Sequence, residues 1–77
     1  MFKIIKKKDV EKSVYYLQTC IENHRRLMDE TEQLLEDEKL SDSVRTNLIH
    51  TRSLHVAKYF AYRDALYEFE KLGLYEP

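Results

Sequence analysis

The chain has 77 residues, of which 35 % are charged and 43 % hydrophobic, and its formal net charge is −1. This length allows one domain with a barely sufficient core. The single Gly and single Pro favour long helices over sheets or a disordered tail. A net charge near zero gives no overall attraction to nucleic acid or to an anionic membrane.

Cysteine content and the N-terminal segment indicate the cellular compartment. Cys20 is the only cysteine and cannot form an internal disulfide, whereas small secreted domains usually carry several cysteine pairs. The N-terminal segment lacks the apolar core of a signal peptide. No apolar stretch approaches the roughly 20 residues that span a bilayer. We therefore expect a cytoplasmic protein with no membrane partner.

Residues 1–8 are predicted to form a basic extended arm, followed by a first helix over about 9–39 with Asp9 as its N-cap. Apolar or small residues recur in this helix in steps of four and three, which is a heptad repeat. They are Val10, Val14, Leu17, Ile21, His24, Met28, Thr31 and Leu35. A flank of Cys20, Leu27 and Leu34 makes the face wider than a two-stranded seam needs.

The sequence Leu40-Ser41-Asp42-Ser43 predicts a break and then a second helix over about 41–72, with Ser41 as the expected N-cap and Ser43 as the alternative. Gly73 is expected to be a left-handed C′ residue, with Leu74 contacting Phe69 as in a Schellman ending. The apolar stripe of this helix consists of Leu48, Arg52, His55, Tyr59, Tyr62, Leu66 and Phe69, flanked by Ile49 and Val56.

A short turn between two long helices predicts an all-α fold, an antiparallel two-helix hairpin of the coiled-coil type. Two helices alone cannot cover faces this wide, so we expect a homodimer in which two hairpins form a four-helix bundle. The expected oligomer interface consists of Val14, Leu17, Ile21, Leu27, Met28, Leu34, Leu35, Leu48, Ile49, Val56, Tyr59, Tyr62, Leu66 and Phe69.

Antiparallel folding would gather all nine aromatic residues at the open end of the hairpin and leave an acidic tip, residues 29–38, at the closed end. Adjacent Tyr15 and Tyr16 point about 100° apart, so one neighbour cannot bury both. Tyrosine is also enriched at binding hot spots. The expected partner-binding residues are Tyr15, Tyr16, Tyr67 and Tyr75, with Glu32 and Glu36 of the acidic tip as a second candidate. Acids at a helix C-terminus oppose the helix dipole and lower stability. A sequence that keeps them there is expected to use their charge.

His24 and His55 lie on the two stripes and should face each other after folding. Together with Cys20 they could bind zinc if a fourth ligand were present. The simpler interpretation is a polar layer in which the histidines bond to each other, or to Thr31, Thr51 or Arg52, and so fix the register of the helices. We expect the polar layer, and therefore no metal and no other cofactor.

Two other function classes find little support in the sequence. The lysines of the arm could contact phosphate or nucleic acid, but lysines beside glutamates are more often a solvated surface, so we expect no nucleic-acid partner. A Gly-rich phosphate loop and a recognisable nucleophile motif are both missing, and we expect no enzyme.

The sequence therefore predicts a non-enzymatic helical hairpin that self-associates and binds another protein as a regulator or inhibitor. This architecture is similar to that of small helical-hairpin regulators, such as inhibitors of bacterial kinases, as a likeness of fold alone. Two alternatives stay open. One is a metal-binding bundle that uses Cys20, His24 and His55, and the other is a nucleic-acid-associated accessory protein that uses the basic arm.

Overall fold

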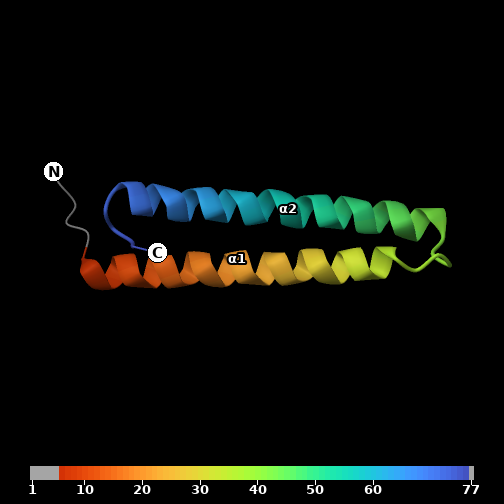
Figure 1. Cartoon of the computed structure of the whole chain (residues 1–77), viewed down its shortest axis with the longest axis horizontal. Coiled ribbons are helices and arrows are strands. Elements are labelled where there is room, and N and C mark those ends of the chain that lie inside the picture. The colour runs from red at the N-terminus through yellow and green to blue at the C-terminus, as the bar shows by residue number, and fades with distance from the viewer. Residues whose placement is uncertain (1–5, 77) are drawn as a thin grey trace.

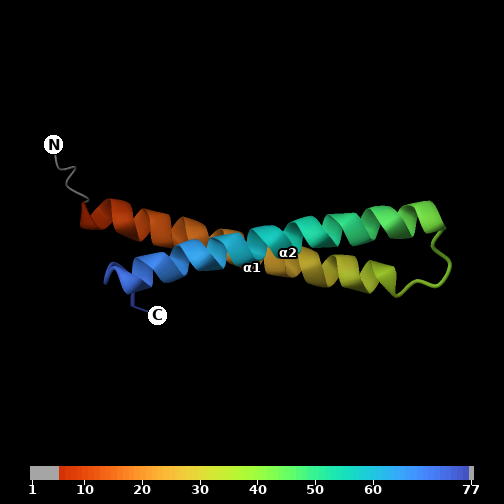
Figure 2. The same cartoon turned by 90° about the horizontal axis from the view of Figure 1, so that it is seen from above.

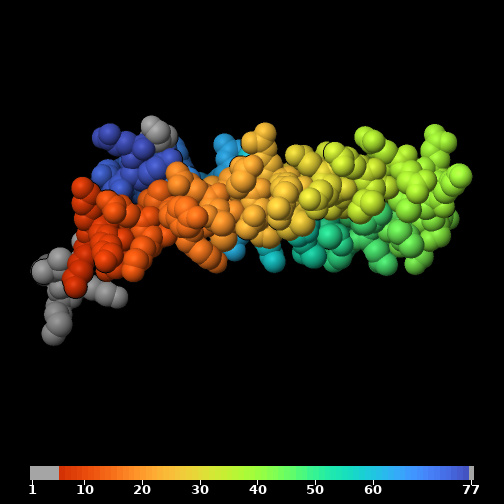
Figure 3. All heavy atoms as spheres, turned by 90° about the horizontal axis from the view of Figure 1, so that it is seen from below, coloured from red at the N-terminus to blue at the C-terminus, as the bar shows by residue number. Residues whose placement is uncertain are grey.

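The computed structural model describes residues 6–76 and contains two helices, α1 (Lys7–Leu35) and α2 (Asp42–Lys71). They lie antiparallel and are joined by one short loop, so the start of α1 and the end of α2 meet at the open end (Figure 1). A view turned by 90° shows the two helices crossing (Figure 2). The principal extents are 57 × 23 × 17 Å, and the space-filling view shows the same narrow rod (Figure 3). The predicted all-α antiparallel hairpin is confirmed.

The first helix begins two residues before Asp9, so Asp9 is not its N-cap. Lys6 occupies that position with an extended backbone and no side-chain cap, and its carbonyl accepts from the Asp9 and Val10 N–H groups at 3.0 and 3.1 Å. Asp9 lies instead in the first turn, where its negative charge favours the positive end of the helix dipole. The predicted arm over 1–8 is therefore shorter, because Lys7 and Lys8 are helical, and residues 1–5 lie outside the described residues.

The end of α1 at Leu35 comes about four residues earlier than predicted. Arg45 of α2 reaches across the loop, and its guanidinium donates to the carbonyls of Leu35 and Asp37, both at 3.0 Å. The Leu35 carbonyl is one of the groups that a helix terminus leaves without a partner inside the helix, whereas the Asp37 carbonyl belongs to the loop and also accepts from the Leu40 N–H. The Asp37 carboxylate also accepts from the Lys39 N–H at 2.9 Å, which forms a tight turn. The loop is thus held by contacts that come partly from the other helix.

The ends of α2 follow the sequence prediction. The Ser41 hydroxyl accepts from the Val44 N–H at 3.2 Å, which makes Ser41 the N-cap. At the other end Gly73 has a φ of 73°, the Gly73 N–H donates to the Glu70 carbonyl, and the Leu74 N–H donates to the Phe69 carbonyl. These two bonds define a Schellman ending.

The seam between the helices contains very few fully buried side chains. Within residues 6–76 only Val10 and Thr31 are buried, at 9 % and 6 % exposure. The Thr31 hydroxyl donates to the Leu27 carbonyl at 2.7 Å, so this buried polar group has a partner. The predicted interface residues are half-buried, apart from Leu34 and Ile49, which are exposed. In the described part of the chain, neither helix has the length and apolar character needed to cross a membrane.

Candidate interaction site

The two sides of the seam differ in character, because the apolar flanks predicted for the two helices lie on opposite faces of the hairpin. In an antiparallel pair, one face is formed by the residues that come directly before each stripe residue of α1, together with the residues that come directly before each stripe residue of α2. The opposite face is formed by the residues that come directly after the stripe residues. Two surface grooves agree with this arrangement: one contains Ser13 with Ala65, and the other contains Ile21 with Arg63. The Leu27 flank and the Ile49 flank therefore point away from each other.

We call the face that carries the Leu27 flank the leucine face. Its helical positions hold only four charged residues, Asp9, Glu30, Lys58 and Glu68. The large apolar side chains Leu34, Leu54 and Tyr16 on it are 57, 50 and 59 % exposed. The full set is Asp9, Ser13, Tyr16, Cys20, Asn23, Leu27, Glu30, Leu34, Val44, Asn47, Thr51, Leu54, Lys58, Ala61, Ala65 and Glu68.

The opposite side is called the charged face, because nine of its helical positions carry charge: Lys8, Glu11, Glu22, Arg25, Asp29, Glu32, Asp42, Arg63 and Glu70. Its apolar residues are concentrated on α2, where Ile49 and Phe60 are 48 and 51 % exposed. Arg63 extends over the rings of Tyr59 and Phe60, with its guanidinium carbon 5.5 and 5.9 Å from the ring centroids. This cation–π contact partly shields both rings from water.

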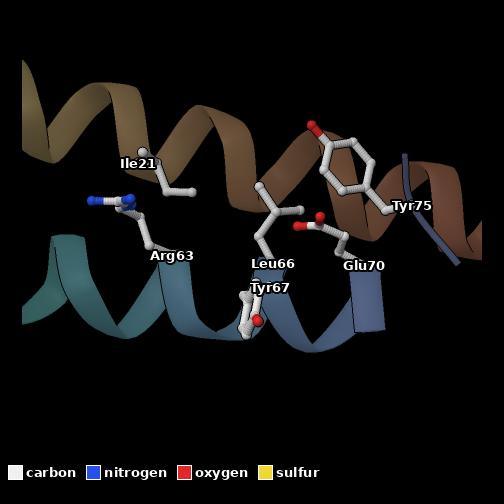
Figure 4. Close-up of a pocket in the computed structure, with 6 residues that line it drawn as sticks. All are labelled: Ile21, Arg63, Leu66, Tyr67, Glu70 and Tyr75. Carbon is white, nitrogen blue, oxygen red and sulfur yellow. The ribbon is translucent and has the colours of Figure 1, made fainter. Parts of the chain in front are cut away.

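Tyr75 closes a groove of about 280 Å³ at the open end of the charged face. Figure 4 shows Tyr75 coming from the segment after α2 and lying near α1, with the Glu70 side chain directed toward it. Its hydroxyl accepts from the Gln18 side-chain amide at 3.0 Å. The remaining lining residues are Ile21, Arg63, Leu66 and Tyr67. Sequence reasoning missed this return of the chain, because nothing local to Tyr75 predicts a bond to a residue 57 positions earlier.

A second groove, of about 420 Å³, lies at the open end of the leucine face and is lined by Lys12, Ser13, Tyr16, Leu17, Ala65 and Phe69. The Tyr16 ring packs edge-on against Tyr62 at a centroid distance of 6.4 Å. The neighbouring Cys20 thiol, followed by the proximity of Tyr62, raises the pKa of the Tyr16 phenol above its ordinary value. Tyr16 and Cys20 thus lie together on the leucine face.

The histidine layer forms as predicted. The Nδ1 atoms of His24 and His55 lie 3.0 Å apart, and the His24 ring stacks on Tyr62 at 5.6 Å. Burial is the main cause that lowers the pKa of His24, and the nearby His55 and Lys58 lower it further. Of the other residues predicted for this layer, Thr31 bonds within α1, Arg52 pairs with Glu32 at 3.7 Å, and Thr51 is exposed.

The predicted partner-binding residues do not form one patch. Tyr15 and Tyr67 are 72 and 56 % exposed on the charged face, whereas Tyr16 is on the leucine face and Tyr75 is half-buried. Glu32 and Glu36 are exposed at the closed end, and Glu32 already has Arg52 as a partner. The structure thus separates residues that the aromatic pattern had grouped.

The three candidate metal ligands do not come together as one site, although His24 and His55 are in contact. Among residues 6–76 no group of three or more His, Cys, Asp or Glu side chains is placed to hold a metal ion, so Cys20 does not complete a site with His24 and His55. Comparison with known proteins identifies no relative: no family model, no curated protein and no solved structure matches this chain.

Proposed function

We propose that this chain is a cytoplasmic, non-enzymatic binding protein, which self-associates and binds another protein as a regulator or inhibitor. The observation that carries the proposal is the exposure of its apolar side chains. Leu34, Leu54 and Tyr16 are half exposed or more, and among the described residues only Val10 and Thr31 are buried. Apolar surface that is left open in this way usually marks an interface.

The two faces support a division between self-association and partner binding. The leucine face, with few charges and long apolar side chains, resembles the inner surface of a helical bundle. At the open end of the charged face, Tyr15 and Tyr67 present large rings to solvent, and Tyr75 borders the adjacent groove. Tyrosine favours interfaces because its ring is rigid and apolar while its hydroxyl tolerates water. Tyr16 belongs to the same end, and Glu32 with Glu36 is the second candidate surface.

Self-association is tested by sedimentation equilibrium of the full chain at micromolar concentration. We expect a mass of at least two chains, because one hairpin leaves the apolar side chains of both faces partly exposed to solvent. A wild-type chain that stays monomeric across the concentration range would contradict this part of the proposal, and would favour a different protein as the source of the missing helices.

Partner binding is tested by capturing proteins from the native cell with the full chain, and then measuring the affinity of each captured protein in purified form. Tyr15→Ala combined with Tyr67→Ala should weaken the interaction at least about tenfold, because each truncated hot-spot tyrosine typically costs 1 kcal/mol or more. The matched control is Thr46→Ala, an exposed position of the same face at the closed end. Circular dichroism should be unchanged in both variants. Normal binding by the tyrosine variant would contradict a role of Tyr15 and Tyr67 in the interface and would leave Glu32 and Glu36 as the candidate binding surface.

A further inference from the structure

The area that the hairpin leaves uncovered matches what a second copy of the chain would bury. The chain exposes 6608 Å² at a mass of 9.3 kDa, whereas a compact monomer of that mass exposes about 5,000 Å². The excess over two chains is roughly 3,200 Å², and homodimers that are stable only as assemblies bury about 2,000–5,000 Å². A second hairpin is therefore an occupant of the right size.

The leucine face is the side that such a copy can cover at the lower cost. It holds four charged residues against nine on the charged face, and every charge taken into a dry interface loses hydration. Its one basic residue, Lys58, has a long apolar stem that can carry the ammonium group to the edge of an interface. Leu27, Leu34 and Leu54 supply the long apolar side chains that a bundle core needs.

Charge also distinguishes the two ways of placing two hairpins face to face. If both point in the same direction, the two acidic tips meet, each with six acids and no basic residue over positions 29–38. If one is turned end for end, each tip lies over the first turn of α1 of the other copy. Residues 6–12 carry four lysines against two acids. Complementary charge at the two ends favours the end-for-end orientation, and the long apolar stem of Lys58, which would lie near its copy at the middle of α2, can carry the two ammonium groups apart.

We propose that the leucine face is covered by a second copy turned end for end, so that α1 packs on α1 of the other copy across a twofold axis. This inference rests on the proposed self-association, and it specifies which face is buried and how the two copies are oriented. Cys20 lies one residue from the midpoint of α1, so the two Cys20 residues meet near the axis, within about 3 Å along the helix direction. Lys12, which lines the groove at the open end of the leucine face, and Glu30 on that face lie equally far from the midpoint of α1, on either side, so each is placed near the other across the dimer.

Oxidative cross-linking of Cys20 in the wild-type chain tests this geometry, with diamide as the oxidant. A disulfide needs Cα atoms within about 7 Å, so the covalent dimer should form readily in the native state. The matched control is Leu27→Cys in a Cys20→Ala background. Two copies of that position are about 18 Å apart along the helix in the end-for-end dimer, so the control should not cross-link. Cross-linking of both chains, or of neither, would overturn the proposal.

Sedimentation separates a failure of this geometry from a failure of self-association. A wild-type dimer whose Cys20 does not cross-link leaves self-association standing and refutes the arrangement, whereas a wild-type monomer refutes both. Leu34→Lys should dissociate the dimer, while Ile49→Lys, equally apolar but on the charged face, should not. The charge pairing predicts that Lys12→Glu weakens the dimer about tenfold and that adding Glu30→Lys restores it. A dimer that resists Leu34→Lys but is broken by Ile49→Lys would contradict the assignment of the face.

Discussion

His24 and His55 approach each other across the seam with their Nδ1 atoms 3.0 Å apart. A hydrogen bond at this distance requires one ring nitrogen to donate and the other to accept, so the contact needs at least one neutral imidazole. Burial, followed by the charges of His55 and Lys58, lowers the pKa of His24 and so favours its neutral form. The contact that holds the two helices in register therefore depends on the protonation state of His24 and His55.

The first prediction is a loss of stability as the pH falls. Because the pKa of His24 is lower in the folded chain than its ordinary value of about 6.5, its contribution is fully present above about pH 6.5 and is lost as the pH falls through the folded pKa. Thermal melts between about pH 7.5 and 5 should show a falling melting temperature. In His24→Gln the fall should be smaller, and a wild-type chain that grows more stable over this range would contradict the assignment.

The second prediction concerns the end of α1. Arg45→Ala should lower the free energy of unfolding by about 1–2 kcal/mol, because the Leu35 carbonyl at the helix terminus and the Asp37 carbonyl in the loop both lose a charged donor. The control is Arg26→Ala, which removes only a solvent-exposed contact to Glu30 at 3.9 Å and should cost less than about 0.5 kcal/mol. Equal effects in urea titrations would show that Arg45 is not a specific cap.

The third prediction concerns Gly73, whose φ of 73° is the left-handed conformation that side chains disfavour. A Cβ at this position would meet nothing within 4 Å, so the cost of substitution comes from the backbone alone. Gly73→Ala should destabilise the chain by about 1 kcal/mol, and Gly73→Asn by less, because Asn tolerates this conformation. Equal stability of wild type and Gly73→Ala would mean that the Schellman ending does not persist in solution.

The fourth prediction concerns metal. Since Cys20 does not join the histidine pair, melts with and without a chelator should coincide for protein prepared without a histidine tag. A large drop in melting temperature on adding the chelator would favour the metal-binding alternative, and Cys20→Ser would then test whether the thiol is a ligand.

The sequence was sufficient for those features that depend on local pattern. The heptad spacing and the break near Leu40 predict the hairpin and the meeting of His24 with His55, because periodicity alone determines which side chains share a stripe. Ser41 and Gly73 are recognisable caps, because each acts on backbone groups within a few residues of itself.

The features that were missed depend on contacts between distant segments. The end of α1 is set partly by Arg45 from the other helix, and Tyr75 is placed by a bond to Gln18. The opposite placement of the two apolar flanks follows from the way the helices pair, which neither helix encodes alone. The sequence does not determine whether Asp9 is the N-cap or a residue of the first turn, because its negative charge is favourable near the free N–H groups at the start of a helix in both positions.

The most direct test of the central claim, that one hairpin has too small a core to be the working unit, is the concentration dependence of the melting temperature. For a folded state that is a dimer, a hundredfold rise in protein concentration changes the free energy of the assembly by about 2.7 kcal/mol. The melting temperature should therefore rise by several degrees between about 2 and 200 μM. A melting temperature that is constant over this range, with a monomeric mass at both ends, would contradict the claim.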